Sequence, residues 1–128
     1  YYTAITTTHG GFVPEKEITI ARAAWRLDGW VSLDAGAAGG VVETVDVEPK
    51  GGALWVNADV GGGELRVEVL DATGAVIRGY GAEDCLPLRE NGVRQVVRWQ
   101  DQNVLPKARP IRLRFLPQNA RLFSWWAE

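Results

Sequence analysis

Short runs in which apolar and polar residues alternate fill most of this 128-residue sequence. In the clearest run, Leu65, Val67 and Val69 alternate with charged residues. Because successive side chains of a β-strand point to opposite faces, such a run places one row in a core and the other row toward solvent. From about Thr19 onward we find no convincing stripe of the kind that an amphipathic helix shows. The pattern therefore predicts an all-β chain.

Clusters of Gly, Asp, Asn and Pro separate these runs, as turns separate strands. Gly61–Gly63 and Asp71–Gly74 are typical of hairpin turns, in which glycine supplies positive φ angles. About eight strands suit a two-sheet antiparallel β-sandwich of the jelly-roll or concanavalin-like kind. The expected strands are Thr19–Asp28, Trp30–Asp34, Val41–Glu48, Ala53–Asp59, Glu64–Asp71, Arg94–Gln100, Pro110–Leu116 and Arg121–Trp126. The rows expected in the core include Leu54, Val56, Ala58, Leu65, Val67, Val69, Ile111, Leu113 and Phe115.

The length and the net charge of the chain limit the classes of protein to which it can belong. A chain of 128 residues matches one domain, and it has no apolar run of the roughly 20 residues that span a bilayer. The net charge of -2 gives no overall attraction to nucleic acid or to anionic lipid. We expect residues 1–18 to be a leader or linker from a preceding domain, and residues 19–128 to form the β-sandwich module.

The sequence predicts no catalytic residue. Glycoside hydrolysis normally uses two facing carboxyl groups, and the acidic residues here fall at strand ends, in turns and in outer rows. The single histidine, His9, lies in the leader without a cysteine or serine motif beside it. The single cysteine, Cys85, excludes an intrachain disulfide and is read as a small buried hydrophobic residue.

Six tryptophans favour a binding function, because the apolar faces of sugar rings stack on aromatic side chains. By strand parity, Trp55 shares its row with polar residues and Trp125 shares its row with Arg121, so both are expected at the surface. Trp99 is assigned to the core. Core or domain-interface positions are expected for Trp25, Trp30 and Trp126.

Four arginines are expected to flank the two exposed tryptophans and to favour an acidic sugar. The alternative is that Glu64 and Glu68 pair with them in an ordinary solvated surface. The candidate carbohydrate-binding residues are therefore Trp55, Trp125, Arg66, Arg98, Arg112 and Arg114.

No cofactor and no metal site are predicted. A structural calcium ion needs several oxygen ligands gathered from loops, and no loop shows a dense acidic spacing. The oxygen donors that loops would offer are Asp28, Asp34, Asp59 and Asp84.

Four stretches resemble a known family of modules: Arg26–Gly36, Gly63–Asp71, Asp84–Pro87 and Asn119–Trp125. They are similar to the C-terminal β-sandwich that follows a five-bladed β-propeller in bacterial glycoside-hydrolase-like proteins related to invertases and arabinanases. The leader is similar to the segment that leaves the propeller. Glu90-Asn91 stands where the family pattern has an aspartate after the Cys-Pro loop. The family's catalytic carboxylates lie in the propeller, so none is carried over.

The resemblance implies a non-catalytic accessory module of a secreted glycoside hydrolase, located outside the cell or in the periplasm. Its expected partners are a preceding catalytic domain in the same polypeptide and a polysaccharide, with no role for nucleic acid or membrane. An autonomous carbohydrate-binding module is the alternative, and a self-contained glycosidase is a third function.

Overall fold

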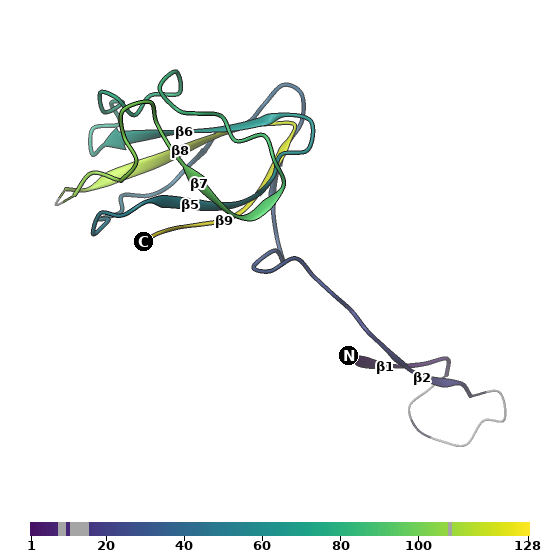
Figure 1. The fold of residues 1–128 in the computed structure, drawn as a ribbon. Helices are drawn as coiled ribbons and strands as arrows, with labels where there is room; N and C mark the ends of the chain where they lie inside the picture. Colours follow the sequence, from purple (N-terminus) through teal and green to yellow (C-terminus); the bar gives the residue numbers. More distant parts are fainter. Residues whose placement is uncertain (8–9, 11–15, 108) are drawn as a thin grey trace.

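The computed structural model describes residues 1–7, 10, 16–107 and 109–128. Nine β-strands and no helix are found among these residues, which confirms the all-β prediction (Figure 1). The described residues therefore also contain no helix that is long and apolar enough to cross a membrane. The strands are β1 Tyr2–Ile5, β2 Ile18–Ala21, β3 Leu33–Ala35, β4 Val42–Glu43, β5 Leu54–Asp59, β6 Glu64–Asp71, β7 Gly92–Val97, β8 Ile111–Gln118 and β9 Ala120–Ala127.

Two antiparallel sheets face each other and form the predicted sandwich (Figure 1). The four-stranded sheet has the order β3-β9-β5-β7, and the three-stranded sheet has the order β4-β8-β6. From β3 to β9, each strand lies in the sheet opposite its predecessor, while β3 and β9 are neighbours. This alternation is the jelly-roll arrangement. Beside β6, residues 75–88 contribute isolated bridges at Val76 and Leu88 in place of an eighth regular strand.

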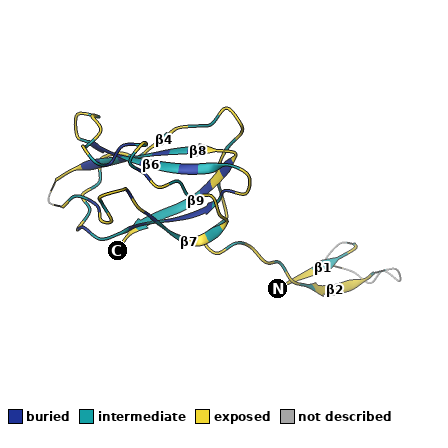
Figure 2. Ribbon diagram, turned by 45° about the horizontal axis from the view of Figure 1, so that its top comes forward, coloured by how far each residue is buried: buried dark blue, intermediate teal, exposed yellow. Residues whose placement is uncertain are grey.

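The core lies between the sheets (Figure 2). The predicted rows of β6 and β8 are at most 1% exposed and meet across their strand pairing, as Val67 does with Phe115. Trp99 is equally buried, and its indole Nε1 donates a hydrogen bond to the Val67 carbonyl at 2.9 Å. Trp99 is therefore a core residue, as the sequence predicted.

The strand expected at Thr19–Asp28 differs from the structure. β2 ends at Ala21 and pairs with β1 in a separate two-stranded sheet. The chain then runs without strand structure to a turn in which the Gly29 amide donates to the Arg26 carbonyl at 3.1 Å. Period-two alternation alone does not show whether a strand finds a partner in the main sheets, and β2 finds its partner in β1.

The strand expected at Val41–Glu48 is also interrupted. β4 covers two of its residues, and a single bridge joins Val47 to Ile111. Between them the Thr44 hydroxyl accepts a hydrogen bond from the Leu113 amide at 3.0 Å. A side-chain oxygen thus takes the place of a backbone carbonyl in the ladder, which ends the regular pairing.

The hairpin of β1 and β2 lies apart from the sandwich, at the far end of an extended connecting segment (Figures 1 and 2). An isolated two-stranded hairpin is marginally stable in water at best. This position leaves most side chains of the hairpin exposed to solvent.

Candidate functional site

A β-bulge in β9 decides which tryptophans share a face. Trp55 lies opposite Trp126 and Val56 lies opposite Trp125, but the register shifts after Asn57 and leaves Phe123 as an extra residue in β9. An extra residue moves every following side chain to the other face of the strand. The expectation that Trp125 shares an exposed row with Arg121 is therefore wrong.

Trp125 points into the sandwich. Its ring lies 6.2 Å from that of Phe115, and it packs against the buried cluster of the core. The tryptophan that shares the outer face with Trp55 is Trp126, which the sequence analysis had assigned to the core or to a domain interface.

The outer face of the four-stranded sheet carries a cluster that we call the tryptophan face, formed by Trp55, Trp126 and Arg94. The guanidinium carbon of Arg94 lies 4.5 Å from the ring centre of Trp55 and 5.8 Å from that of Trp126. Arg94 also forms an ion pair with Glu128. Cation–π contacts and the ion pair thus hold the arginine over both indole rings.

Two buried polar atoms of this sheet have no hydrogen-bond partner. They are the indole Nε1 of Trp55 and the hydroxyl Oγ of Ser124, and among the described residues only Thr7 Oγ1 shares this condition. Ser124 lies opposite Asn57, two residues along the same face from Trp55. Buried polar groups are nearly always paired, so two unpaired ones on neighbouring strands need an explanation.

Arg26 attaches the connecting segment to the same sheet. Its guanidinium donates to Asn57 Oδ1 at 2.5 Å, to Asn91 Oδ1 at 2.6 Å and to the Ala58 carbonyl at 3.1 Å. It also lies 4.7 Å from the ring centre of Phe123. Asn57 lies in the outward row of Trp55, yet it is only 1% exposed because this segment covers it.

Residues 25–30 form a structure that we call the tryptophan turn. The rings of Trp25 and Trp30 stack with their centres 4.7 Å apart and an interplanar angle of 29°. Asp28 has a φ of 49° at the bend. The two tryptophans are 61% and 74% exposed, so neither lies in the core of this chain.

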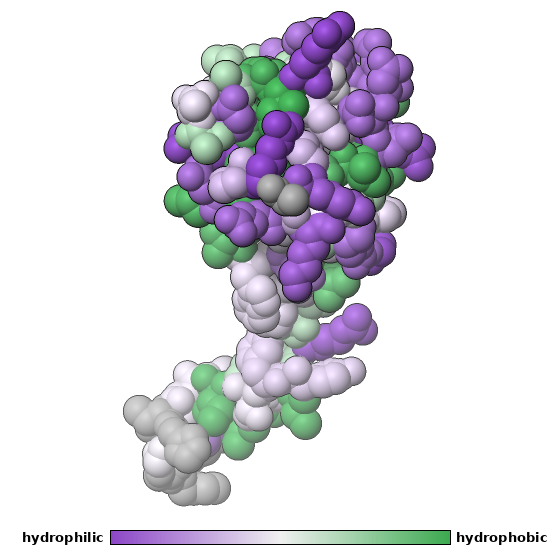
Figure 3. Space-filling view, turned by 90° about the vertical axis from the view of Figure 1, so that its left-hand side faces the viewer, coloured by the Kyte–Doolittle hydropathy of each residue, from purple (hydrophilic) through white to green (hydrophobic). Residues whose placement is uncertain are grey.

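Other large apolar side chains are exposed near the tryptophan turn and in the hairpin. In Figure 3 the small lower lobe, which contains the hairpin, carries hydrophobic residues on its surface. Among the described residues up to position 45, the exposed set comprises Tyr1, Tyr2, Ile18, Ile20, Trp25, Leu27, Trp30, Val31, Leu33, Val41 and Val45.

The outer face of the three-stranded sheet carries ion pairs. Arg112 Nε lies 2.6 Å from Asp46, and Arg114 lies 3.1 Å from Glu43 and 3.0 Å from Glu68. The hydrogen bond to Asp46 raises the pKa of Arg112, and the hydrogen bond to Glu43 raises the pKa of Arg114. Both of these candidate arginines are thus already paired with carboxylates of the same chain.

Arg66 and Arg98 lie in different surroundings. Arg66 pairs with Glu64 at 2.8 Å and donates to the carbonyls of Ala82 and Cys85, each at 2.9 Å. Arg98 follows β7, which belongs to the four-stranded sheet. Arg66 thus shares the outer face of the three-stranded sheet with Arg112 and Arg114, whereas Arg98 belongs to the other sheet. The four arginines do not form the single surface that was expected, because strand parity does not tell which sheet a strand joins.

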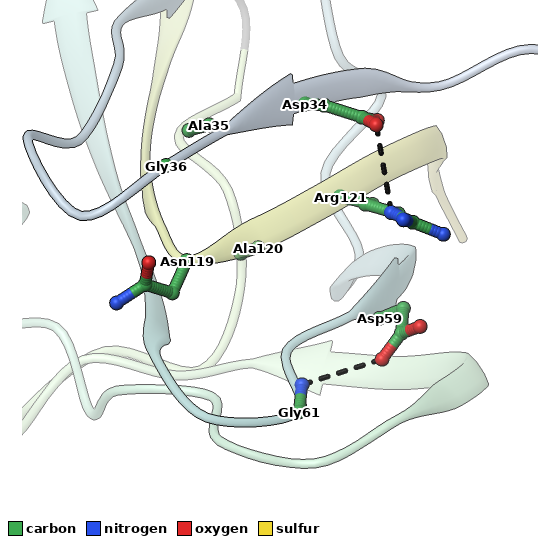
Figure 4. Close-up of a pocket in the computed structure, with 8 residues that line it drawn as sticks. All are labelled: Asp34, Ala35, Gly36, Asp59, Gly61, Asn119, Ala120 and Arg121. Carbon is green, nitrogen blue, oxygen red and sulfur yellow. Dashed lines mark hydrogen bonds and ion pairs between the residues drawn. The ribbon is translucent and has the colours of Figure 1, made fainter.

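A hollow of about 470 Å³ lies at one end of the four-stranded sheet (Figure 4). Asp34, Arg121 and Asp59 form a row across three adjacent strands, with Asp34 Oδ2 at 3.5 Å from Arg121 Nε. Asp59 Oδ1 accepts a hydrogen bond from the Gly61 amide at 3.3 Å. Both carboxylates thus have partners within the chain.

The hollow brings together two of the four aspartates that were considered as calcium donors. Asp28 lies instead in the tryptophan turn, and Asp84 Oδ2 accepts from the Gly81 amide at 3.1 Å. Within residues 1–7, 10, 16–107 and 109–128, no three His, Cys, Asp or Glu side chains gather in a way that would hold a metal ion.

Cys85 is 2% exposed, and its sulfur accepts a hydrogen bond from the Val67 amide at 3.2 Å. Burial raises the pKa of this thiol, which disfavours the reactive thiolate. His9 lies outside the described residues.

No known family model, no curated protein and no solved structure matches this chain significantly.

Proposed function

We propose that this chain is a non-catalytic accessory module that packs against a glycoside-hydrolase catalytic domain outside the cell or in the periplasm. The observation that carries the proposal is the tryptophan turn, where Trp25 and Trp30 are exposed although the turn is firmly attached to the sandwich. Tryptophan is enriched among the residues that contribute most to binding at protein interfaces, and large exposed apolar patches usually mark interaction sites.

The neighbours of the turn favour a protein partner at this position. Leu27, Val31 and Leu33 are 68%, 75% and 53% exposed. Aliphatic side chains of this kind offer no hydrogen bonds to sugar hydroxyls, but they bury well in the apolar centre of a protein interface. Arg26 fixes the turn in advance, which lowers the entropy lost on docking.

The hairpin supports docking in a second way. The eight residues of β1 and β2 carry no charge and no proline, although natural edge strands are usually protected by charges, prolines or bulges. Ile5 and Ile18 pair on one face of the hairpin, next to the pair of Thr3 with Ile20. A hairpin of this composition gains stability when it packs against another sheet.

The choice of a glycoside hydrolase as the partner rests on the resemblance of four sequence stretches to modules that follow β-propeller glycosidases. The non-catalytic role is supported by the open hollow, in which Arg121 lies between Asp34 and Asp59 and pairs with Asp34. A glycosidase needs two carboxyl groups that face each other across the sugar bond.

The test combines the chain with the catalytic domain that this proposal places in the same polypeptide, each produced separately. We expect a 1:1 complex in light scattering coupled to size-exclusion chromatography, and a higher melting temperature of the catalytic domain in the complex. The variant Trp25→Ser/Trp30→Ser should lose both effects. The chain alone should release no reducing ends from plant, algal or bacterial polysaccharides.

The control is Leu86→Ser, which removes an exposed apolar side chain far from the turn in the sequence and should leave the complex intact. Absence of association, or association that the turn variant does not weaken, would refute the docking role. Turnover by the chain alone that one carboxylate substitution abolishes would refute the non-catalytic role.

A further inference from the structure

We propose that the tryptophan face is a binding site for an uncharged polysaccharide chain. This site lies on the sandwich itself, and the proposal does not depend on the docking role of the tryptophan turn. It rests on the arrangement of Trp55, Trp126 and Arg94 and on the unpaired polar atoms of Trp55 and Ser124.

The two indoles lie on the same outer face of the sheet, and both are partly exposed. Trp55 and Trp126 are paired directly across β5 and β9 on the outer side of the sheet. Directly paired side chains on adjacent strands have their Cβ atoms about 5 Å apart, which is close to the length of one sugar ring. Sugar rings place their C–H groups against aromatic faces, so two adjacent indoles suit consecutive rings of an extended chain.

The unpaired polar atoms supply the second observation. Trp55 Nε1 is a donor, and Ser124 Oγ is both a donor and an acceptor. A buried group without a partner destabilises the fold and needs an explanation, of which a bound ligand, ion or water molecule is one. Sugar hydroxyls donate and accept, and a bound chain would pair with these two atoms once the side chains that now cover them, Arg94 among them, have moved.

The ion pair of Arg94 and Glu128 favours an uncharged ligand. They form an ion pair beside the indoles, so the site presents one positive and one negative group to a sugar. Such a pair can hydrogen-bond to neutral hydroxyls without loss of charge balance, whereas an acidic sugar would meet the Glu128 carboxylate. The arginines of the other sheet are already paired with carboxylates, so they do not favour an acidic polymer either.

Arg94 lies over Trp55 and must move to admit a sugar ring. Its side chain is 55% exposed, and an exposed arginine rearranges within nanoseconds. Binding therefore exchanges a cation–π contact for stacking and hydrogen bonds, which predicts moderate affinity.

The experiment is affinity electrophoresis of the whole chain in gels that contain xylan, hydroxyethyl cellulose, linear arabinan, levan or polygalacturonate. We expect retention by at least one of the four neutral polymers. Trp126→Ala should remove it. Trp55→Phe keeps an aromatic ring but deletes the Nε1 donor, and it should weaken binding about fivefold, as expected for one hydrogen bond, with the melting temperature little changed.

Trp30→Ala is the matched control, because Trp30 belongs to the tryptophan turn and should not affect retention. No retention by any neutral polymer would overturn the proposal, as would retention that survives both Trp126→Ala and Trp55→Phe. Retention by polygalacturonate alone that moderate salt abolishes would also overturn the proposal. It would indicate that the candidate arginines bind an acidic polymer through their charge. None of these results would affect complex formation with a catalytic domain.

Discussion

Trp125 lies directly opposite Val56 across the pairing of β5 and β9, on the side of the sheet that faces the core. Trp125→Ala should therefore lower the free energy of unfolding by about 2 to 4 kcal/mol, slightly less than is usual for a fully buried aromatic residue. Urea unfolding monitored by far-ultraviolet circular dichroism measures this loss. A loss below about 0.5 kcal/mol would place Trp125 at the surface after all.

Leu113 is fully buried in β8, whereas Leu116 lies in the outer row of the same strand, opposite Arg66. Leu113→Ala should cost about 2 to 5 kcal/mol because it leaves a cavity between the sheets. Leu116→Ala should cost about 1 kcal/mol or less. Equal losses in the two variants would mean that the sandwich does not bury the inner row of β8.

Local alternation predicted those parts of the fold that local sequence controls. The bounds of β6, Glu64–Asp71, agree with the sequence prediction at both ends, and its inner row is buried. Alternation failed at Phe123, because a bulge arises from the pairing of two strands and leaves no mark in either strand alone. One extra residue was enough to exchange Trp125 for Trp126 on the outer face.

The candidate site was partly predictable for the same reason. Trp55 precedes the bulge in its strand pairing, and its outward position follows from parity alone. The alternative of surface ion pairs was confirmed for Arg66 with Glu64 and for Arg114 with Glu68, because those partners lie in one sheet. Arg26 was missed, since its acceptors are uncharged and lie more than 30 residues away.

The lowered pKa of Glu64 predicts that the free energy of unfolding depends on pH. The hydrogen bond from Arg66, and then that from Arg89, hold the pKa of Glu64 below its ordinary value of 4.5. A carboxyl whose pKa is lower in the folded state stabilises the fold fully above its unfolded pKa. This contribution is lost as the pH falls through the folded pKa.

The measurement compares urea midpoints of the native chain and of Glu64→Gln between about pH 7 and pH 2. The native chain should be more stable at neutral pH, and the difference should shrink below about pH 4.5. Asp71, whose pKa is lowered by the Thr73 hydroxyl, is present in both proteins and cancels in the comparison. A difference that stays constant with pH would show that Glu64 gains nothing from ionisation in the fold.

Arg26 attaches the tryptophan turn through three hydrogen bonds, each donated by a different nitrogen of its guanidinium. A lysine in its place has the charge but no planar fork, so it cannot reach Asn57, Asn91 and the Ala58 carbonyl together. Arg26→Lys also leaves the buried Asn57 side chain without its donor. The free energy of unfolding should therefore fall by about 1 to 3 kcal/mol.

A second signal separates loss of this attachment from general destabilisation. The stacked indoles of Trp25 and Trp30 give an exciton-coupled circular-dichroism band, which should weaken in Arg26→Lys at temperatures where the sandwich is still folded. Arg22→Lys, an exposed change in the same segment, is the control and should leave both stability and the band unchanged. If Arg26→Lys keeps the band and the stability of the native chain, the turn is held by its own stacking, and docking through it would need no anchor on the sheet.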